Sequence, residues 1–129
     1  MTGEVVHFEI PLDDVKRGRE FYQKTFGWNL MIDEGMDYTL VSTTEVGPDM
    51  RPKNPGAING GMMKRQSPVK APVITINVDD MVATEKTIAK NGGKILQKRT
   101  KIGDGSIGFA GYFQDTEGNV VGLFERAPP

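Results

Sequence analysis

The chain has no cysteine and only one histidine, His7, and these two absences exclude several kinds of site. Without cysteine there is no disulfide and no thiolate metal site, which fits a reducing compartment. With a single imidazole, no serine nucleophile can be combined with a second histidine base. Classical nucleophilic hydrolysis is therefore not expected.

A large charge imbalance and long apolar runs are also missing. The 16 basic and 17 acidic residues nearly cancel, so no strong field for nucleic acid or an anionic membrane is expected. No apolar run approaches the roughly 18 residues of a membrane span. The first ten residues lack the basic and apolar parts of a signal peptide. We therefore expect a cytoplasmic protein that binds neither nucleic acid nor a membrane.

Two strand–helix segments repeat along the chain. The first, EVVHFEIPLDD, alternates like a strand and ends in Asp13-Asp14, either of which can cap a helix. The second, APVITINVDD, ends in the matching pair Asp79-Asp80. Each pair precedes a helical pattern, and glycines stop the two helices at Gly27 and at Gly92-Gly93. The duplication predicts two halves with the same order of elements.

Further strands complete each half. DYTLVST (37–43) and FAGYFQD (109–115) are strand-like, and GGMMKR (60–65) aligns with VGLFER (121–126). We predict an α+β fold with two βαβββ modules, residues 1–66 and 70–129. One helix can cover only one face of each sheet, so the modules are expected to curl as a mixed sheet around a central cleft, with the helices outside.

Three motifs occur in order: HFEIPLDD, REFYQKTFGW and GYFQDTEGNVVGLFE. Together with the duplication, they resemble the vicinal oxygen chelate superfamily, which includes glyoxalase I, extradiol dioxygenases and bleomycin-resistance proteins. The likeness spans nearly the whole chain and is greatest for the glyoxalase-like branch. It implies a small-molecule ligand. Because the superfamily hosts many reactions and some pure binders, it does not define an activity.

The resemblance also implies where a divalent metal would bind. In such proteins the ligands are a His or its equivalent on the first strand of each half and a Glu or its equivalent on the last strand. The matching positions here are His7 and Glu125, which would suit Zn, Ni, Fe or Mn. The other two positions are Val73, which cannot coordinate, and Lys64, which would repel a cation. Two ligands fall short of the three that catalytic sites usually have.

Several alternatives stay open for these residues. A further ligand could come from Glu9, or from Thr75 or Asn77 in the second half. Glu9 is favoured because it is anionic, although it lies about 7 Å along the strand from His7. Glu125 or Glu9 would then move a proton on the chelated substrate. Without a metal, Glu125 pairs with Lys64 or Arg126, and His7 with Glu125 could still act as an acid–base pair.

The cleft is expected to be lined by residues of strands on both sides. Thr75 and Asn77 lie on the first strand of the second half, opposite the first strand of the first half. Thioether side chains suit an adaptable apolar pocket. The predicted substrate-binding residues are Tyr112, Phe113, Met62, Met63, Thr75 and Asn77.

Two functions of different class remain at this stage. One is a metal-dependent lyase, isomerase or dioxygenase acting on a small substrate that chelates through neighbouring oxygens. The other is a metal-free protein that binds or sequesters a small molecule. Open sheet edges and the family resemblance predict a homodimer. If the halves are exchanged between subunits, His7 of one chain would face Glu125 of the other.

Overall fold

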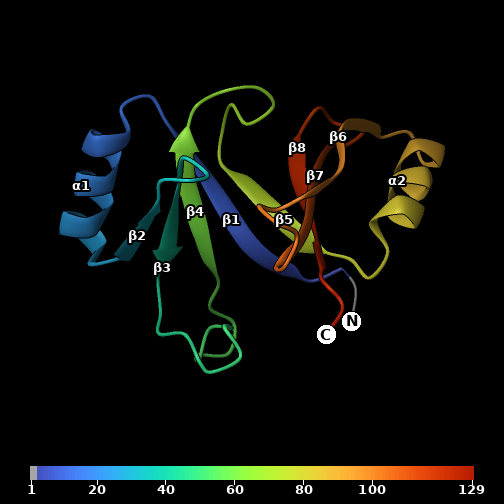
Figure 1. Ribbon diagram of the computed structural model, residues 1–129. Coiled ribbons are helices and arrows are strands. Elements are labelled where there is room, and N and C mark those ends of the chain that lie inside the picture. Colours follow the sequence, from blue (N-terminus) through green and yellow to red (C-terminus); the bar gives the residue numbers. More distant parts are fainter. Residues whose placement is uncertain (1–2) are drawn as a thin grey trace. The chain divides into compact units, whose positions relative to one another are not determined.

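The computed structural model describes residues 3–129 (Figure 1). It divides the chain into two compact units. We call residues 7–72 the N-terminal unit, and residues 73–129, with the start of the chain up to Val6, the C-terminal unit. The predicted α+β class and the two βαβββ repeats are confirmed. The elements in chain order are β1 Val5–Leu12, α1 Val15–Phe26, β2 Asn29–Asp33, β3 Tyr38–Ser42, β4 Asn59–Lys64, β5 Val73–Asn77, α2 Met81–Lys90, β6 Lys94–Lys101, β7 Gly108–Gln114 and β8 Val120–Arg126.

The N-terminal unit has its strands in the order β2-β3-β4-β1. β1 and β4 run parallel, and the other neighbours are antiparallel. Side chains alternate between the two faces, so Leu12, Val41 and Met62 form the core on the face that α1 covers. His7 and Glu9 occupy the alternate positions of β1 and project from the other face. The alternation in HFEIPL thus separates a packing face from a polar one.

Helix α1 begins and ends as its sequence predicts. Asp14 is the N-cap, and its side chain accepts a hydrogen bond from the backbone N–H of Arg17 at 3.0 Å. Gly27 adopts the left-handed conformation that ends the helix. A Cβ at position 18 would overlap the side chain of Leu12. This glycine therefore lets α1 lie directly against the end of β1.

The C-terminal unit repeats this plan, with strands in the order β5-β8-β7-β6 and a parallel β5–β8 pair. Val78, Met81 and Leu123 form its core, and Ile88 of α2 packs against them. Asp80 caps α2 by accepting a hydrogen bond from the backbone of Ala83 at 3.0 Å. Among residues 3–129, no helix is both long enough and apolar enough to cross a membrane.

Candidate functional site

The polar face of the N-terminal unit holds a chain of three side chains. The hydroxyl of Tyr38 on β3 lies 2.8 Å from Nε2 of His7 and donates to Oε2 of Glu9, also at 2.8 Å. The imidazole and phenol rings are nearly parallel, with an interplanar angle of 15°. His7 and Glu9 are two residues apart on one strand, which is too far for them to bind the same metal ion easily. The hydroxyl of Tyr38 lies between them and bonds to both. The structure therefore links both predicted residues through a third that sequence reasoning did not single out.

Gly61 makes this arrangement sterically feasible. It lies on β4, opposite Glu9 on one side and Leu40 on the other. A Cβ at this position would overlap the hydroxyl end of the Tyr38 ring. Because position 61 has no side chain, the ring of Tyr38 can cross β4 and reach β1. The sequence GG at 60–61 thus marks a close approach, and it was the one available signal for the tyrosine.

Burial sets the protonation of the imidazole. Desolvation lowers the pKa of His7 below its usual 6.5, although the nearby carboxylate of Glu9 acts in the opposite direction. His7 is therefore neutral at pH 7. Since Tyr38 uses its own proton on Glu9, its oxygen accepts from the Nε2–H of His7. This assignment leaves the lone pair of the neutral imidazole on Nδ1.

Apolar side chains lie beside the hydrogen-bonded residues His7, Tyr38 and Glu9 on the same face. Met31 and Leu40 are neighbours on β2 and β3, and Leu40 is the direct neighbour of Gly61. Their exposed fractions are 65% and 42%, while Met63 further along β4 is half-buried. A buried hydrogen-bonded group next to exposed apolar surface is the composition that small-molecule sites commonly have.

Glu125 lies in a different environment, on the α2 side of the C-terminal unit. The register of β8 with β7 places Glu125 on the same face as the core residue Leu123. One carboxylate oxygen, Oε1, accepts the first backbone N–H of α2, at Met81, over 2.7 Å. The other, Oε2, accepts from Nε and Nη2 of Arg99 at 3.0 and 2.7 Å. The partner of this acid is thus Arg99, and neither Lys64 nor Arg126.

The pair between Glu125 and Arg99 belongs to a larger contact. The guanidinium of Arg99 lies 3.4 Å from the centre of the Phe109 ring, and the backbone N–H of Arg99 donates to Glu85 of α2 at 2.8 Å. Burial raises the pKa of Glu125, but the hydrogen bonds from Arg99 and Met81 outweigh it, so the pKa of Glu125 is lowered overall. The carboxylate thus ties β8, β6 and the start of α2 together.

The remaining predicted residues are divided between the two faces of their sheets. Met62 is fully buried in the core beneath α1, and Phe113 packs in the core beside α2, so neither is on a polar face. Thr75 and Tyr112 do share a face, because both are in register with Gly122. Asn77 donates to the carboxylate of Glu4 at 3.1 Å.

The residues present do not fit the metal that the superfamily implies. Among residues 3–129, no group of three or more His, Asp or Glu side chains could hold an ion. His7 and Glu9 are each bonded to the hydroxyl of Tyr38, and both oxygens of Glu125 already accept hydrogen bonds. A neutral phenol between the two candidate ligands is a weak substitute for a third ligand. We therefore assign no chemistry through a metal.

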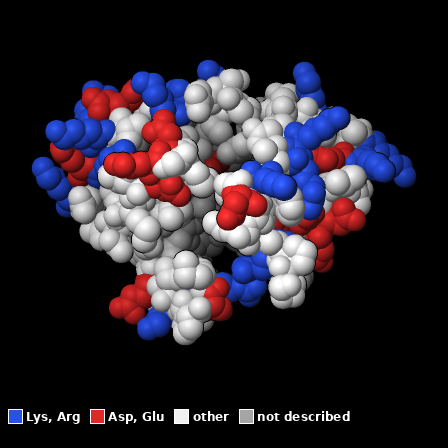
Figure 2. Space-filling view, in the orientation of Figure 1, with Lys and Arg blue, Asp and Glu red and all other residues white. Residues whose placement is uncertain are grey.

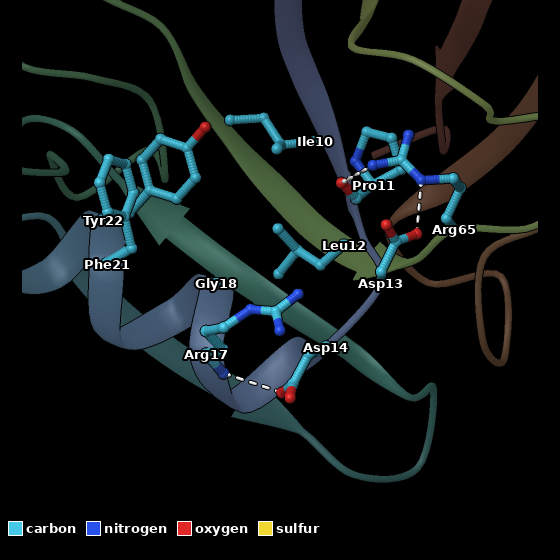
Figure 3. Close-up of a pocket in the computed structure, with 10 residues that line it drawn as sticks. All are labelled: Ile10, Pro11, Leu12, Asp13, Asp14, Arg17, Gly18, Phe21, Tyr22 and Arg65. Carbon is cyan, nitrogen blue, oxygen red and sulfur yellow. Dashed lines mark hydrogen bonds and ion pairs between the residues drawn. The ribbon is translucent and has the colours of Figure 1, made fainter.

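A hollow of about 410 Å³ lies on the other side of the N-terminal unit, between α1 and the end of β1 (Figure 3). Phe21 and Tyr22 form one wall, and Arg65 is held by Asp13 at 2.7 Å. The charges of the lining cancel, since Arg17 and Arg65 are matched by two acids. It is lined by Ile10, Pro11, Leu12, Asp13, Asp14, Arg17, Gly18, Phe21, Tyr22 and Arg65. Among these ten lining residues, no buried polar side chains converge as His7 and Glu9 do around Tyr38.

Solved structures with the same arrangement of elements identify the class of fold. A methylmalonyl-CoA epimerase variant from Streptomyces coelicolor, in complex with 2-nitronate-propionyl-CoA, matches with a TM-score of 0.66 over 99% of this chain and 100% of that chain. A hypothetical protein from Bacillus halodurans matches with a TM-score of 0.65 over 98% and 96%. The identities are 18% and 12%, so these likenesses establish the fold alone.

Sequence relatives narrow this to a family. A family model described as bleomycin resistance protein-like N-terminal matches residues 4–44. A glyoxylase-like domain-containing protein from Didymella fabae is 33% identical over 133 residues, covering 98% of this chain and 96% of the relative. Because this relative is similar over nearly its whole length, the chain belongs to the glyoxalase-like proteins of the vicinal oxygen chelate superfamily, as its motifs predicted.

Proposed function

We propose that this glyoxalase-like protein binds a small molecule on the polar face of its N-terminal unit and needs no metal to do so. The observation that carries the proposal is the Tyr38 hydroxyl, which lies 2.8 Å from both His7 and Glu9. This hydroxyl bonds to the only imidazole and to the nearest carboxylate, the two groups that a metal would need. The match of residues 4–44 to a bleomycin resistance protein-like family supports the same choice, since these residues include all three side chains.

The geometry indicates the kind of ligand. The Nδ1 lone pair of neutral His7 would accept one hydrogen bond from a hydroxyl or amide group. Met31 and Leu40 are exposed on the same face and would contact an apolar body. We therefore expect a largely apolar molecule with a single hydrogen-bond donor, and no metal chelation through paired oxygens.

Metal content and ligand binding together test this function. Untagged protein purified without chelator is assayed for Zn, Ni, Fe and Mn, beside His7→Ala. We expect no stoichiometric metal in either protein. Wild-type protein should bind phenols from a fragment panel in the low-affinity range typical of fragments, and His7→Ala should bind the same phenols at least about tenfold more weakly, which is the loss of one good hydrogen bond. A stoichiometric transition metal that disappears in His7→Ala would refute the proposal.

Proton transfer is a second candidate function for the same residues. The lowered pKa of His7 favours it, because a neutral imidazole at pH 7 can accept a proton from a bound molecule. Tyr38 and Glu9 would then stabilise the imidazolium through the hydrogen-bond chain. Exchange of a carbon-bound hydrogen of a bound ligand into deuterated water, lost in Tyr38→Phe and retained after treatment with EDTA, would support catalysis. No exchange with any bound ligand would leave binding as the function.

A further inference from the structure

Charges of opposite sign are segregated along this nearly neutral chain. Between Thr25 and Met50 there is no Lys or Arg, and the acids are Asp33, Glu34, Asp37, Glu45 and Asp49. Between Lys86 and Gly103 there is no Asp or Glu, and the cations are Lys86, Lys90, Lys94, Lys98, Arg99 and Lys101. The net charge of −1 conceals this separation.

The two charged segments include the outermost strands β2 and β6. β2 is the last strand on one side of its sheet. It ends at Asp33, and the turn after it carries Glu34 and Asp37. β6 is the last strand of the other unit's sheet and carries four of the cations, while Lys86 and Lys90 lie on α2. Figure 2 shows acidic side chains gathered over the β2–β3 hairpin and basic ones over β6 and α2.

Most of these charges are available to a partner. Lys94, Lys98 and Lys101 are exposed, and none forms an ion pair with another residue of 3–129. Arg99 is the exception, because Glu125 binds it. Glu34 is likewise exposed and makes no ion pair with the described residues.

The β2 edge has little protection against pairing. An edge strand presents unpaired backbone N–H and C=O groups, and proteins usually protect it with lysine, proline or a bulge. β2, with the sequence NLMID, has none of these, and Met31 and Ile32 are 65% and 51% exposed. β6 does carry lysines, which discourage pairing with a copy of itself.

We propose that the β2 edge, with its acidic hairpin, binds the β6 edge of a second copy of this chain. Pairing of β2 with β2 would place acids against acids, and pairing of β6 with β6 would place lysines against lysines. Only the mixed contact combines opposite charges, and it adds backbone hydrogen bonds and covers Met31. Because every molecule has both edges, the contact either repeats twice in a closed dimer or continues into a longer assembly.

A charge-swap experiment tests this contact. The acid-swapped variant is Asp33→Lys/Glu34→Lys, and the base-swapped variant is Lys98→Glu/Lys101→Glu, which spares Arg99. The matched control is Lys86→Glu/Lys90→Glu, with the same change of charge on α2 and away from the edge. Molar mass is measured by light scattering during gel filtration, in low salt and in about 0.5 M salt, where screening acts within a few ångströms. Circular dichroism checks that each variant is folded.

We expect wild-type protein and the α2 control to associate in low salt, with an apparent dissociation constant that rises about tenfold or more in high salt. Each edge variant alone should be monomeric, because its two edges then repel. An equimolar mixture of the two edge variants should associate again, since the acid-swapped β2 matches the base-swapped β6. A wild-type protein that is monomeric at every salt concentration would overturn the proposal. Edge variants that still associate alone, or a mixture that stays monomeric, would also overturn it. The same holds if wild-type protein is monomeric and binds single-stranded DNA through β6.

Discussion

Replacing Glu125 with glutamine tests whether this acid is a structural anchor, as its contacts indicate. Glutamine keeps an oxygen that can accept the backbone N–H of Met81, which the carboxylate now does at 2.7 Å. It removes the negative charge that binds Arg99 through two hydrogen bonds, at 3.0 and 2.7 Å. The substitution therefore removes the ion pair and keeps the hydrogen bond to the start of α2.

The expected cost follows from exposure. Hydrogen bonds to charged groups contribute about 1.5–3 kcal/mol, whereas fully exposed ion pairs contribute less than about 1 kcal/mol. The side chain of Glu125 is 13% exposed and that of Arg99 is 35% exposed, so the pair lies between these limits. We expect Glu125→Gln to lower the free energy of unfolding by about 2 kcal/mol. Glu125→Ala also loses the hydrogen bond from the backbone N–H of Met81 and should cost about 1 kcal/mol more.

Urea denaturation across a range of pH provides the assay. The pKa of Glu125 is lower in the folded protein than its usual 4.5, so its contribution to stability is present above about pH 4.5. That contribution is lost as the pH falls through the folded pKa, because the carboxylate must then be protonated. The difference between wild type and Glu125→Gln should therefore be full at pH 7 and disappear in acid.

A double-mutant cycle with Arg99→Met separates the pair from other effects. Combining it with Glu125→Gln should cost less than the sum of the single changes, with a coupling of about 1–2 kcal/mol. Additive single changes would refute the ion pair. If EDTA destabilised the wild type as much as Glu125→Gln does, and had no effect on Glu125→Gln, Glu125 would bind a metal. That result would refute the structural role of Glu125.

The remaining predictions concern the polar face of the N-terminal unit. Gly61→Ala should lower the free energy of unfolding by about 2 kcal/mol and displace Tyr38, which near-ultraviolet circular dichroism would detect. Gly35→Ala, in an open turn, should change the free energy of unfolding by less than about 0.5 kcal/mol. Equal effects of the two substitutions would contradict the close approach of Tyr38 to Gly61. Tyr38→Phe should lower the free energy of unfolding in urea by about 1–2 kcal/mol with an unchanged far-ultraviolet spectrum, and a neutral change would contradict the two hydrogen bonds. Because the pKa of His7 is lowered by burial, wild-type stability should rise with pH between the folded pKa and the unfolded value of 6.5, where the unfolded chain binds more protons. His7→Gln should remove that rise, and an unchanged slope would contradict the burial of His7.

The fold could be predicted because its signals are local and occur twice. The caps at Asp14 and Asp80 and the stop at Gly27 depend on hydrogen bonds within a few residues, and the structure confirms them. The alternation in β1 also placed His7 and Glu9 on one face correctly. A duplicated pattern gave the same answer independently in each half.

The site was harder to predict because it depends on register between strands. Glu125 lies near the end of the apolar strand β8, and the sequence does not say which face of that strand α2 covers. Only the folded sheet places it on the same face as the core residue Leu123. Tyr38 reaches Glu9 across a whole strand, a contact that needs both the register of β3 with β4 and the absence of a side chain at Gly61. Arg99 stands in the basic run QKRTK, where nothing local distinguishes it from its exposed neighbours.

Nitrogen NMR of His7 tests the central claim most directly, because the chain has no other histidine to overlap its signals. We predict a neutral imidazole at pH 7 with its proton on Nε2 and a pKa below 6.5, and a spectrum unchanged by EDTA or by equimolar Zn²⁺. Tyr38→Phe should shift the Nε2 signal and leave Nδ1 nearly unchanged. A large Zn²⁺-induced shift of either ring nitrogen at stoichiometric metal would contradict the proposal that this hydrogen-bonded site needs no metal.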